Sequence, residues 1–327
     1  CALPILKSEP TLSILVPCYN VEKYLNQCLL SIQNQTFKDF EVICLNDGST
    51  DSTISILKSF QKQDSHFKII DKPNTGYGDS MNIGLQSAKG KYIGIVESDD
   101  YVDHRMFQKL VEEAQAKNLD ISRCGYYLSA RGEITPVKNE WVKKNIVFNP
   151  NIDSSPFWQA PAIWSAIYKR EWLLQNGIGF LPSPGASYQD TSFAFKCYAC
   201  CERFQMIPEA LLFYRTDNGQ SSVNSKAKAF CVCKEWREIY EFVKGNRGRF
   251  GQLLPLLPML QYGTYRWNFK RISSPKLKLF FLMVWRKECL THLLAGDYPL
   301  YSTARELSRK VSNKLKTSIR RKTKVVQ

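Results

Sequence analysis

The first hundred residues alternate between strand-like and helix-like patterns, which limits the folds that the chain can adopt. Apolar runs predict strands, and stretches with a 3.6-residue period predict helices between them: strands over 12–16, 40–45, 67–71 and 92–96, and helices over 21–32, 52–63 and 79–88. Such alternation predicts a parallel sheet covered by helices. Polar residues that follow the strands then gather in one crevice, where ligands bind.

The composition indicates a globular protein with an anionic partner. The 327 residues are 44% hydrophobic and carry a formal net charge of +15. Nucleotide phosphates, anionic lipids and nucleic acids are the candidate partners of such a charge. No apolar run reaches transmembrane length and no signal peptide is visible. Many of the eleven cysteines lie in apolar runs, which is typical of reduced, buried thiols in a cytosolic protein, so we expect a cytoplasmic location.

The strand over 92–96 ends in an acidic cluster. Glu97, Ser98, Asp99 and Asp100 place three carboxylates within four residues. Their mutual repulsion is costly unless a cation or hydrogen-bond donors neutralise it. Hard oxygen ligands suit Mg²⁺ or Mn²⁺, which commonly bridge to substrate phosphates. The alternative is a solvated acidic turn in which Asp100 or Asp103 caps the next helix.

Four motifs occur in a fixed order, whereas neither G-x-G-x-x-G after the first strand nor G-x-x-x-x-G-K-[ST] is present. The motifs are Val16-Pro-Cys-Tyr-Asn-Val-Glu22, Asn46-Asp-Gly-Ser-Thr-Asp51, Asn82-Ile-Gly84 and Glu97-Ser-Asp-Asp100. Over residues 10–225 the chain resembles the GT-A glycosyltransferases of family 2. The resemblance implies an α/β GT-A domain over 1–225, with a Rossmann-like mixed sheet flanked by helices. A helical, basic region over 226–327 would follow.

The resemblance also implies an activity. Members of this family transfer a sugar, with inversion, from a nucleotide diphosphate sugar with the help of a divalent metal. We therefore expect a UDP-sugar donor, a glycan or lipid-linked acceptor and a role in cell-surface polysaccharide synthesis. Mn²⁺ or Mg²⁺ would bind Asp99 and Glu97. Glu97 replaces the usual first Asp of the family's D-x-D motif, and Met81 stands where many relatives have an Arg.

The remaining binding residues are also carried over from the family. Asp47 would accept a hydrogen bond from the nucleobase of the donor, and Asn74 would approach the diphosphate or sugar. Gly76 and Gly78 would do the same, at positions where a Cβ would clash. Arg215 is either a phosphate clamp or a plain surface charge. The other expected donor contacts are Pro17, Tyr19, Glu22, Ser98 and Asp100.

A Pro/Gly-rich loop over 182–188 leads to Asp190 at the start of an apolar helix over 191–200. In the family this Asp resembles the catalytic base, which takes the proton of the acceptor hydroxyl. The alternative reading is a helix N-cap. Trp158 and Trp164 are candidates for stacking on a sugar, although core packing explains most aromatic residues.

The C-terminal region lacks motifs but is basic. Residues 305–324 contain nine basic residues and one acidic residue, with apolar residues at four-residue spacing. This predicts either a basic amphipathic helix on an anionic membrane, at the inner face of the plasma membrane, or a solvated tail. Two other functions stay open: a nucleotidyltransferase acting on a sugar phosphate, and a basic nucleic-acid-binding protein. Because no nucleic-acid-reading module is recognisable, we expect no nucleic acid partner.

Overall fold

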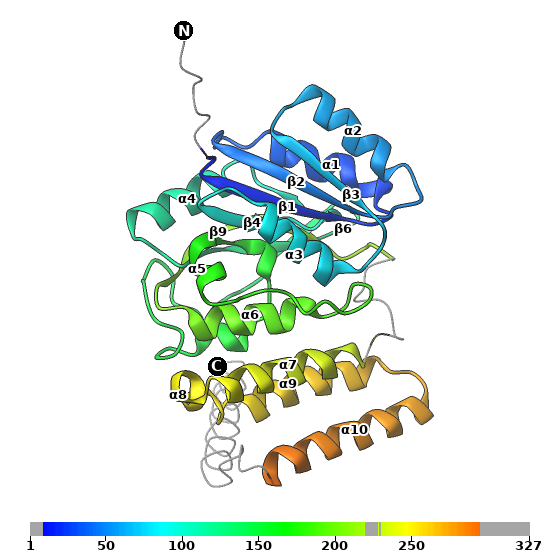
Figure 1. The fold of residues 1–327 in the computed structure, drawn as a ribbon, viewed down its shortest axis with the longest axis vertical. Coiled ribbons are helices and arrows are strands. Elements are labelled where there is room, and N and C mark those ends of the chain that lie inside the picture. Colours follow the sequence, from blue (N-terminus) through cyan, green and yellow to red (C-terminus); the bar gives the residue numbers. More distant parts are fainter. Residues whose placement is uncertain (1–8, 220–227, 229, 295–327) are drawn as a thin grey trace, which may run out of the picture. The chain divides into compact units, whose positions relative to one another are not determined.

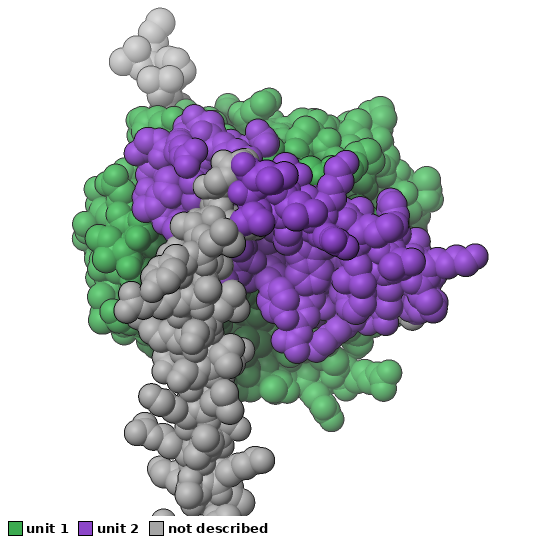
Figure 2. Space-filling view, turned by 90° about the horizontal axis from the view of Figure 1, so that it is seen from below, with its two compact units in different colours: residues 1–239 green, residues 240–327 purple. Residues whose placement is uncertain are grey.

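The structure is a computed structural model that describes residues 9–219, 228 and 230–294. Its contacts divide the chain into two units, residues 1–239 and 240–327 (Figure 1 and Figure 2). The expected boundary after residue 225 lies outside the described residues. The expected basic helix over 305–324 does so as well.

The predicted alternation forms the first part of the sheet. Its elements are β1 (Leu12–Cys18), α1 (Glu22–Gln33), β2 (Phe40–Asp47), α2 (Thr53–Gln63), β3 (Phe67–Lys72), α3 (Tyr77–Ser87) and β4 (Tyr92–Ile95). β1 pairs in parallel with both β2 and β4, and β2 pairs in parallel with β3. The first strand does not end at residue 16, as the apolar pattern predicted, because β1 includes Pro17 and runs on to Cys18. Proline removes one donor, but its φ is compatible with an extended end residue.

The second part of unit 1 makes the sheet mixed. It contains β5 (Tyr101–Val102), α4 (Met106–Ala116), β6 (Ile121–Ala130), β7 (Glu133–Pro136), β8 (Ala166–Lys169), α5 (Arg170–Gln175), α6 (Gln189–Cys200) and β9 (Phe204–Arg215). The strand order is β3-β2-β1-β4-β8-β6-β9-β5, with β7 beside β6. β8 is antiparallel to β4 and β6, and β9 is parallel to β6. In Figure 1, α1 and α2 lie above the sheet, and α3, α5 and α6 lie below it.

Unit 2 is helical, as expected. Helix α7 (Cys231–Gly245) runs across the boundary between the units, and α8 (Arg247–Phe250), α9 (Leu257–Arg271) and α10 (Pro275–Leu294) follow. The Tyr265 ring of α9 contacts the Phe281 ring of α10, with 5.3 Å between centroids. Among the described helices, none is both long enough and apolar enough to cross a membrane.

Candidate active site

The acidic cluster after β4 forms a partly buried turn. The backbone N–H of Asp100 donates to the Glu97 carbonyl at 3.0 Å. The half-buried Glu97 carboxylate accepts a hydrogen bond from the Tyr77 hydroxyl at 2.7 Å. Burial, together with smaller contributions from the nearby charges of Asp99 and Asp190, raises the pKa of Glu97 to about 8. A solvated acidic turn does not describe this arrangement.

Asp99 and Asp100 are held by residues from the end of β9. The Asp99 carboxylate accepts a hydrogen bond from the Asn218 side-chain amide at 2.8 Å. Asp100 is 1% exposed, and its Oδ1 accepts the Arg215 backbone N–H at 2.7 Å. Its Oδ2 is buried and has no hydrogen-bond partner, and burial raises the pKa of this carboxyl well above its usual value. Asp100 does not cap α4, which begins at Met106.

Arg215 is fixed against the acidic turn. Its Nε donates to the Asp99 carbonyl at 2.8 Å, and its Nη2 donates to Gln27 at 2.5 Å. The guanidinium also lies over the Tyr24 ring, at 4.8 Å from the centroid. The reading of Arg215 as a plain surface charge is therefore wrong. Its role toward a phosphate stays a prediction.

Asp47 holds the loop that precedes α3. Its carboxylate accepts the backbone N–H groups of Thr75 at 2.9 Å and Gly76 at 3.0 Å, and it pairs with Lys72 at 2.5 Å. Burial alone would raise the pKa of Asp47, but these donors hold it below its usual value. A nucleobase bound as predicted would have to share the Asp47 carboxylate with these three protein groups.

The glycines of this loop contact protein backbone. Gly76 has φ +99°, and a Cβ there would lie 2.9 Å from the Gly185 nitrogen. A Cβ on Gly78 would lie 2.1 Å from the Leu181 carbonyl oxygen. The close approach expected toward a diphosphate or sugar is therefore made toward the 181–185 loop. A role for Gly76 in donor binding stays a prediction.

The 181–185 loop leads directly to Asp190. The Gln189 side chain fixes this loop, because its amide donates to Ser183 Oγ at 2.8 Å and to the Gly185 carbonyl at 3.0 Å. Tyr188, with φ +65°, is the N-cap residue of α6, so the N-cap reading of Asp190 is wrong. Asp190 lies in the first turn, where a helix favours negative charge.

Asp190 is half-buried, and burial raises its pKa to about 6. A second acid lies close to the same turn. Glu235 of α7 accepts a hydrogen bond from the Ser192 hydroxyl at 2.5 Å. Burial, with a smaller contribution from the charge of Asp190, raises the pKa of Glu235 to about 7.

Tyr214 lies within electrostatic range of the acidic turn and of Asp190. Burial raises the pKa of Tyr214, and the charges of four carboxylates raise it further: Asp100, Asp99, Asp190 and Glu97. The Trp164 ring stacks on Tyr214, with centroids 5.0 Å apart and planes 12° apart. Trp164 is buried, whereas Trp158 is partly exposed. The candidate metal ligands Asp99 and Glu97 and the candidate catalytic base Asp190 are therefore all close enough to act electrostatically on the Tyr214 hydroxyl.

The other expected donor contacts surround the ends of β1 and β2. Pro17 is buried in β1, whereas Tyr19 is 51% exposed just beyond the strand. The Glu22 carboxylate accepts the Ser52 backbone N–H at 2.8 Å, at the start of α2. Ser98 is buried and Asn74 is exposed. No contact in the structure assigns these residues to a nucleotide, so their roles stay predictions.

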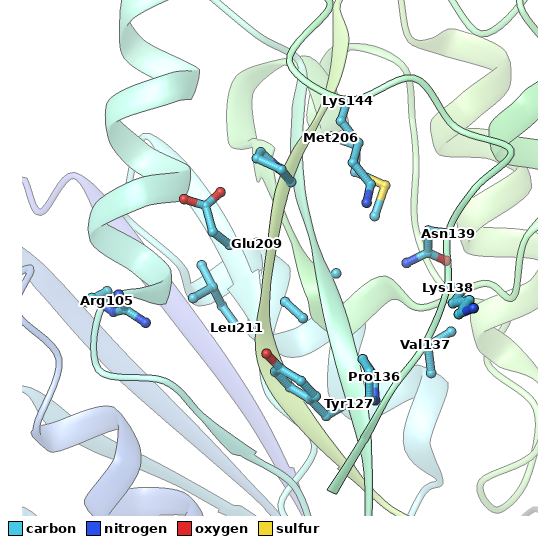
Figure 3. Close-up of a pocket in the computed structure, with 13 residues that line it drawn as sticks. Arg105, Tyr127, Pro136, Val137, Lys138, Asn139, Lys144, Met206, Glu209 and Leu211 are labelled. Carbon is cyan, nitrogen blue, oxygen red and sulfur yellow. The ribbon is translucent and has the colours of Figure 1, made fainter.

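A cavity of about 430 Å³ lies elsewhere in unit 1, between β6, β9 and the segment after β7 (Figure 3). Tyr127, Asn139, Lys144, Met206 and Leu211 are among the residues that surround it. None of the candidate donor, metal or base residues lines this cavity.

The carboxylates fit a divalent ion only if a substrate completes its coordination. Within the described residues, no three His, Cys, Asp or Glu side chains form a ready metal cage. Asp99 and Glu97 offer oxygen ligands, and the buried Asp100 Oδ2 lacks a partner. Mg²⁺ is usually held by one or two carboxylates together with substrate phosphates, and this donor set matches that pattern.

Two contributors to the site were missed in the sequence. The Tyr77 hydroxyl donates a hydrogen bond to Glu97. The position of Tyr77 between Gly76 and Gly78, in a loop expected to line the site, was the sequence signal that could have identified it. Glu235 contacts the first turn of α6 from 43 residues away, and no local pattern identifies it.

Comparison with known proteins assigns the family. Residues 13–173 match the model of glycosyl transferase family 2. The uncharacterized glycosyltransferase EpsJ of Bacillus subtilis is 32% identical over 63% of this chain and 61% of its own length. An uncharacterized glycosyltransferase of Haemophilus influenzae is 31% identical over 58% of this chain and 72% of its own length. The chain belongs to glycosyl transferase family 2, although it spans less than two thirds of EpsJ.

Solved structures confirm the fold. The structure of Staphylococcus aureus TarS in complex with UDP-GlcNAc has a TM-score of 0.59 and 19% identity, over 92% of each chain. The mannosyltransferase PcManGT of Pyrobaculum calidifontis, in complex with GDP-Man and Mn²⁺, has a TM-score of 0.56 and 17% identity. This structural match covers 94% of this chain and 81% of PcManGT. At these identities the likeness shows the GT-A fold alone.

Proposed function

We propose that the chain catalyses inverting transfer of a sugar from a nucleotide diphosphate sugar, with UDP-sugars as the first donors to test. The acceptor would be a glycan or a lipid-linked sugar in cell-surface polysaccharide synthesis. The observation that supports this most is the convergence of Asp190 and the acidic turn around Tyr214. The nucleotide sugars bound by TarS and PcManGT support the donor class. The reaction would take place in the cytoplasm, at the inner face of the plasma membrane when the acceptor is lipid-linked.

Asp190 would act as the general base. The acceptor oxygen attacks the anomeric carbon from the face opposite the diphosphate, and its proton passes to the Asp190 carboxylate. A new carbon–oxygen bond forms while the bond to the diphosphate breaks, and that electron pair leaves with the nucleoside diphosphate. A base is most efficient when its pKa lies near the working pH, and the pKa of about 6 is suitable.

The acidic turn would hold Mn²⁺ or Mg²⁺ through Asp99, with Glu97 as the second ligand. A bound divalent ion would offset negative charge on the departing diphosphate. The chain's own residues keep Asp99 in place, since Asn218 binds its carboxylate and Arg215 binds its carbonyl. Arg215 would contact a phosphate only if its guanidinium exchanged part of this network.

A panel of nucleotide sugars tests the proposal. A bound donor should raise the melting temperature by mass action, and this increase should require Mn²⁺ or Mg²⁺. Product analysis then separates glycosyl transfer, which releases a nucleoside diphosphate, from nucleotidyl transfer, which releases pyrophosphate. Failure of every nucleotide sugar to bind or turn over, with or without metal, would contradict the proposal.

A further inference from the structure

Helix α10 exposes apolar side chains that a helix in water usually buries. Its inward side is formed by Phe281, Glu288 and His292, which are buried. Tyr265 of α9 donates a hydrogen bond to the Glu288 carboxylate at 2.5 Å. Seven apolar side chains of α10 are instead exposed: Leu277, Leu279, Phe280, Leu282, Met283, Leu290 and Leu294. Apolar surface of this extent on one helix indicates an interaction site.

Helix α9 adds amphipathic aromatic side chains to the exposed surface of unit 2. Tyr262 and Trp267 are each about half exposed. The Arg271 guanidinium lies over the Trp267 ring, at 4.3 Å from the centroid. Tyr and Trp are enriched where a lipid bilayer meets water, because each has an apolar ring and a polar group.

The same segment is strongly cationic. Residues 266–287 contain no acidic residue and seven basic ones: Arg266, Lys270, Arg271, Lys276, Lys278, Arg286 and Lys287. The next acidic residue, Glu288, is buried and bonded to Tyr265, so it adds no exposed negative charge to this surface. We call the exposed residues of α9 and α10 between 262 and 294 the α9–α10 surface.

The positive charge of the α9–α10 surface argues against a second copy of this chain, and against the chain's own segment 305–324, as its binding partner. A second copy would bring two cationic surfaces together, and the chain's own segment 305–324 carries nine basic residues and one acidic residue. Nucleic acid would satisfy the charge but has no apolar phase for Leu279, Phe280 and Met283. An anionic lipid bilayer supplies both partners, phosphate head groups and acyl chains.

We infer that the α9–α10 surface binds an anionic lipid bilayer. The exposed leucines, Phe280 and Met283 enter the boundary between head groups and acyl chains, and the lysines and arginines stay at the lipid phosphates. This differs from the expectation for the 305–324 segment, because it assigns membrane contact to another part of the chain. It does not depend on the proposed glycosyl transfer.

Vesicle co-sedimentation of the full chain tests the inference. The vesicles contain either phosphatidylcholine alone or phosphatidylcholine mixed with phosphatidylglycerol, at low and high NaCl. We expect binding to the mixed vesicles that weakens with salt. Each lysine or arginine near an anionic surface contributes about fivefold, so Lys276→Gln, Arg286→Gln and Lys287→Gln together should weaken binding on the order of a hundredfold.

A second variant tests the apolar contact. Leu279, Phe280 and Met283 are 62%, 51% and 53% exposed, so replacing all three with Ser removes little buried contact within the chain. We expect at least about tenfold weaker vesicle binding with an unchanged melting temperature. The matched control replaces Leu30 and Ile152 of unit 1, which are 46% and 88% exposed, with Ser and should bind as the wild type does.

Three results would overturn the inference. One is wild-type chain that does not sediment with phosphatidylglycerol vesicles. Another is wild-type-like binding by the triple glutamine variant, which remains informative even if the triple serine variant fails to fold. The third is a dimer, detected by sedimentation velocity, that the triple serine variant abolishes while vesicle binding is unchanged.

Discussion

Gly78→Ala should displace the 181–185 loop, which leads to the proposed base Asp190. The new Cβ would lie 2.1 Å from the Leu181 carbonyl oxygen, whereas ordinary contact begins at 3.4 Å. The 181–185 loop must therefore move by roughly 1.3 Å, the difference between these distances. A misplacement of about 1 Å can lower turnover on the order of 10²-fold, so we expect a loss of that size.

The effect on stability can be estimated separately. Alanine gains about 1 kcal/mol of helix propensity over glycine, and overpacking costs about 1–3 kcal/mol. The free energy of unfolding should therefore change by between zero and a loss of about 2 kcal/mol. Turnover should fall far more than donor affinity, because the expected donor contacts Pro17, Tyr19 and Glu22 lie from the end of β1 to the start of α1 and not in the displaced loop.

Gly263→Ala provides the matched control. Gly263 also lies inside a helix, α9, but a Cβ there has nothing within 4 Å. This variant should unfold at the same or a higher temperature and keep full turnover. The assay is steady-state release of nucleoside diphosphate, with melting followed by circular dichroism. If Gly78→Ala matches Gly263→Ala in turnover, the loop does not position the base.

Three further predictions concern the base, the metal and the C-terminal segment. Because the base must be ionised and burial raises the pKa of Asp190 to about 6, turnover at saturating donor should fall as the pH drops below about 6; a flat profile between about pH 5 and pH 7 would refute this. Asp99→Ala should abolish metal-dependent binding of the nucleoside diphosphate, and calorimetry that shows equal, metal-independent affinity for both proteins would exclude it. Removal of residues from Arg305 onward should weaken binding to anionic vesicles but leave activity on a soluble acceptor intact; unchanged sedimentation would count against that segment's role.

The sequence predicted the parts of the site that depend on local pattern. Alternating strands and helices place Asp47 and Asp99 at the ends of β2 and β4, because parallel strands share one edge. Asp190 is predicted at a helix start by the loop before it, and the structure places it in the first turn of α6. The four-residue strand β8 has no distinct pattern of its own, so the residue pattern did not locate this antiparallel strand, although the family resemblance implied a mixed sheet.

Contacts between distant residues were not predictable from one sequence. The hydrogen bond from Tyr77 to Glu97 and the one from Ser192 to Glu235 each join separate elements. Gly78 illustrates the same limit. Position 78 requires a glycine because another group approaches it closely, as predicted, but that group is the Leu181 backbone and not a diphosphate or sugar.

Asp190→Asn tests the central claim most directly. The amide keeps the size of the side chain, so folding and donor affinity should survive, but it cannot take the acceptor's proton. Donor affinity by titration and turnover with the acceptor should be measured on one preparation of each protein. The account predicts unchanged affinity and turnover lower by about 10² to 10⁴. Turnover within a few-fold of the wild type would show that Asp190 is not the base.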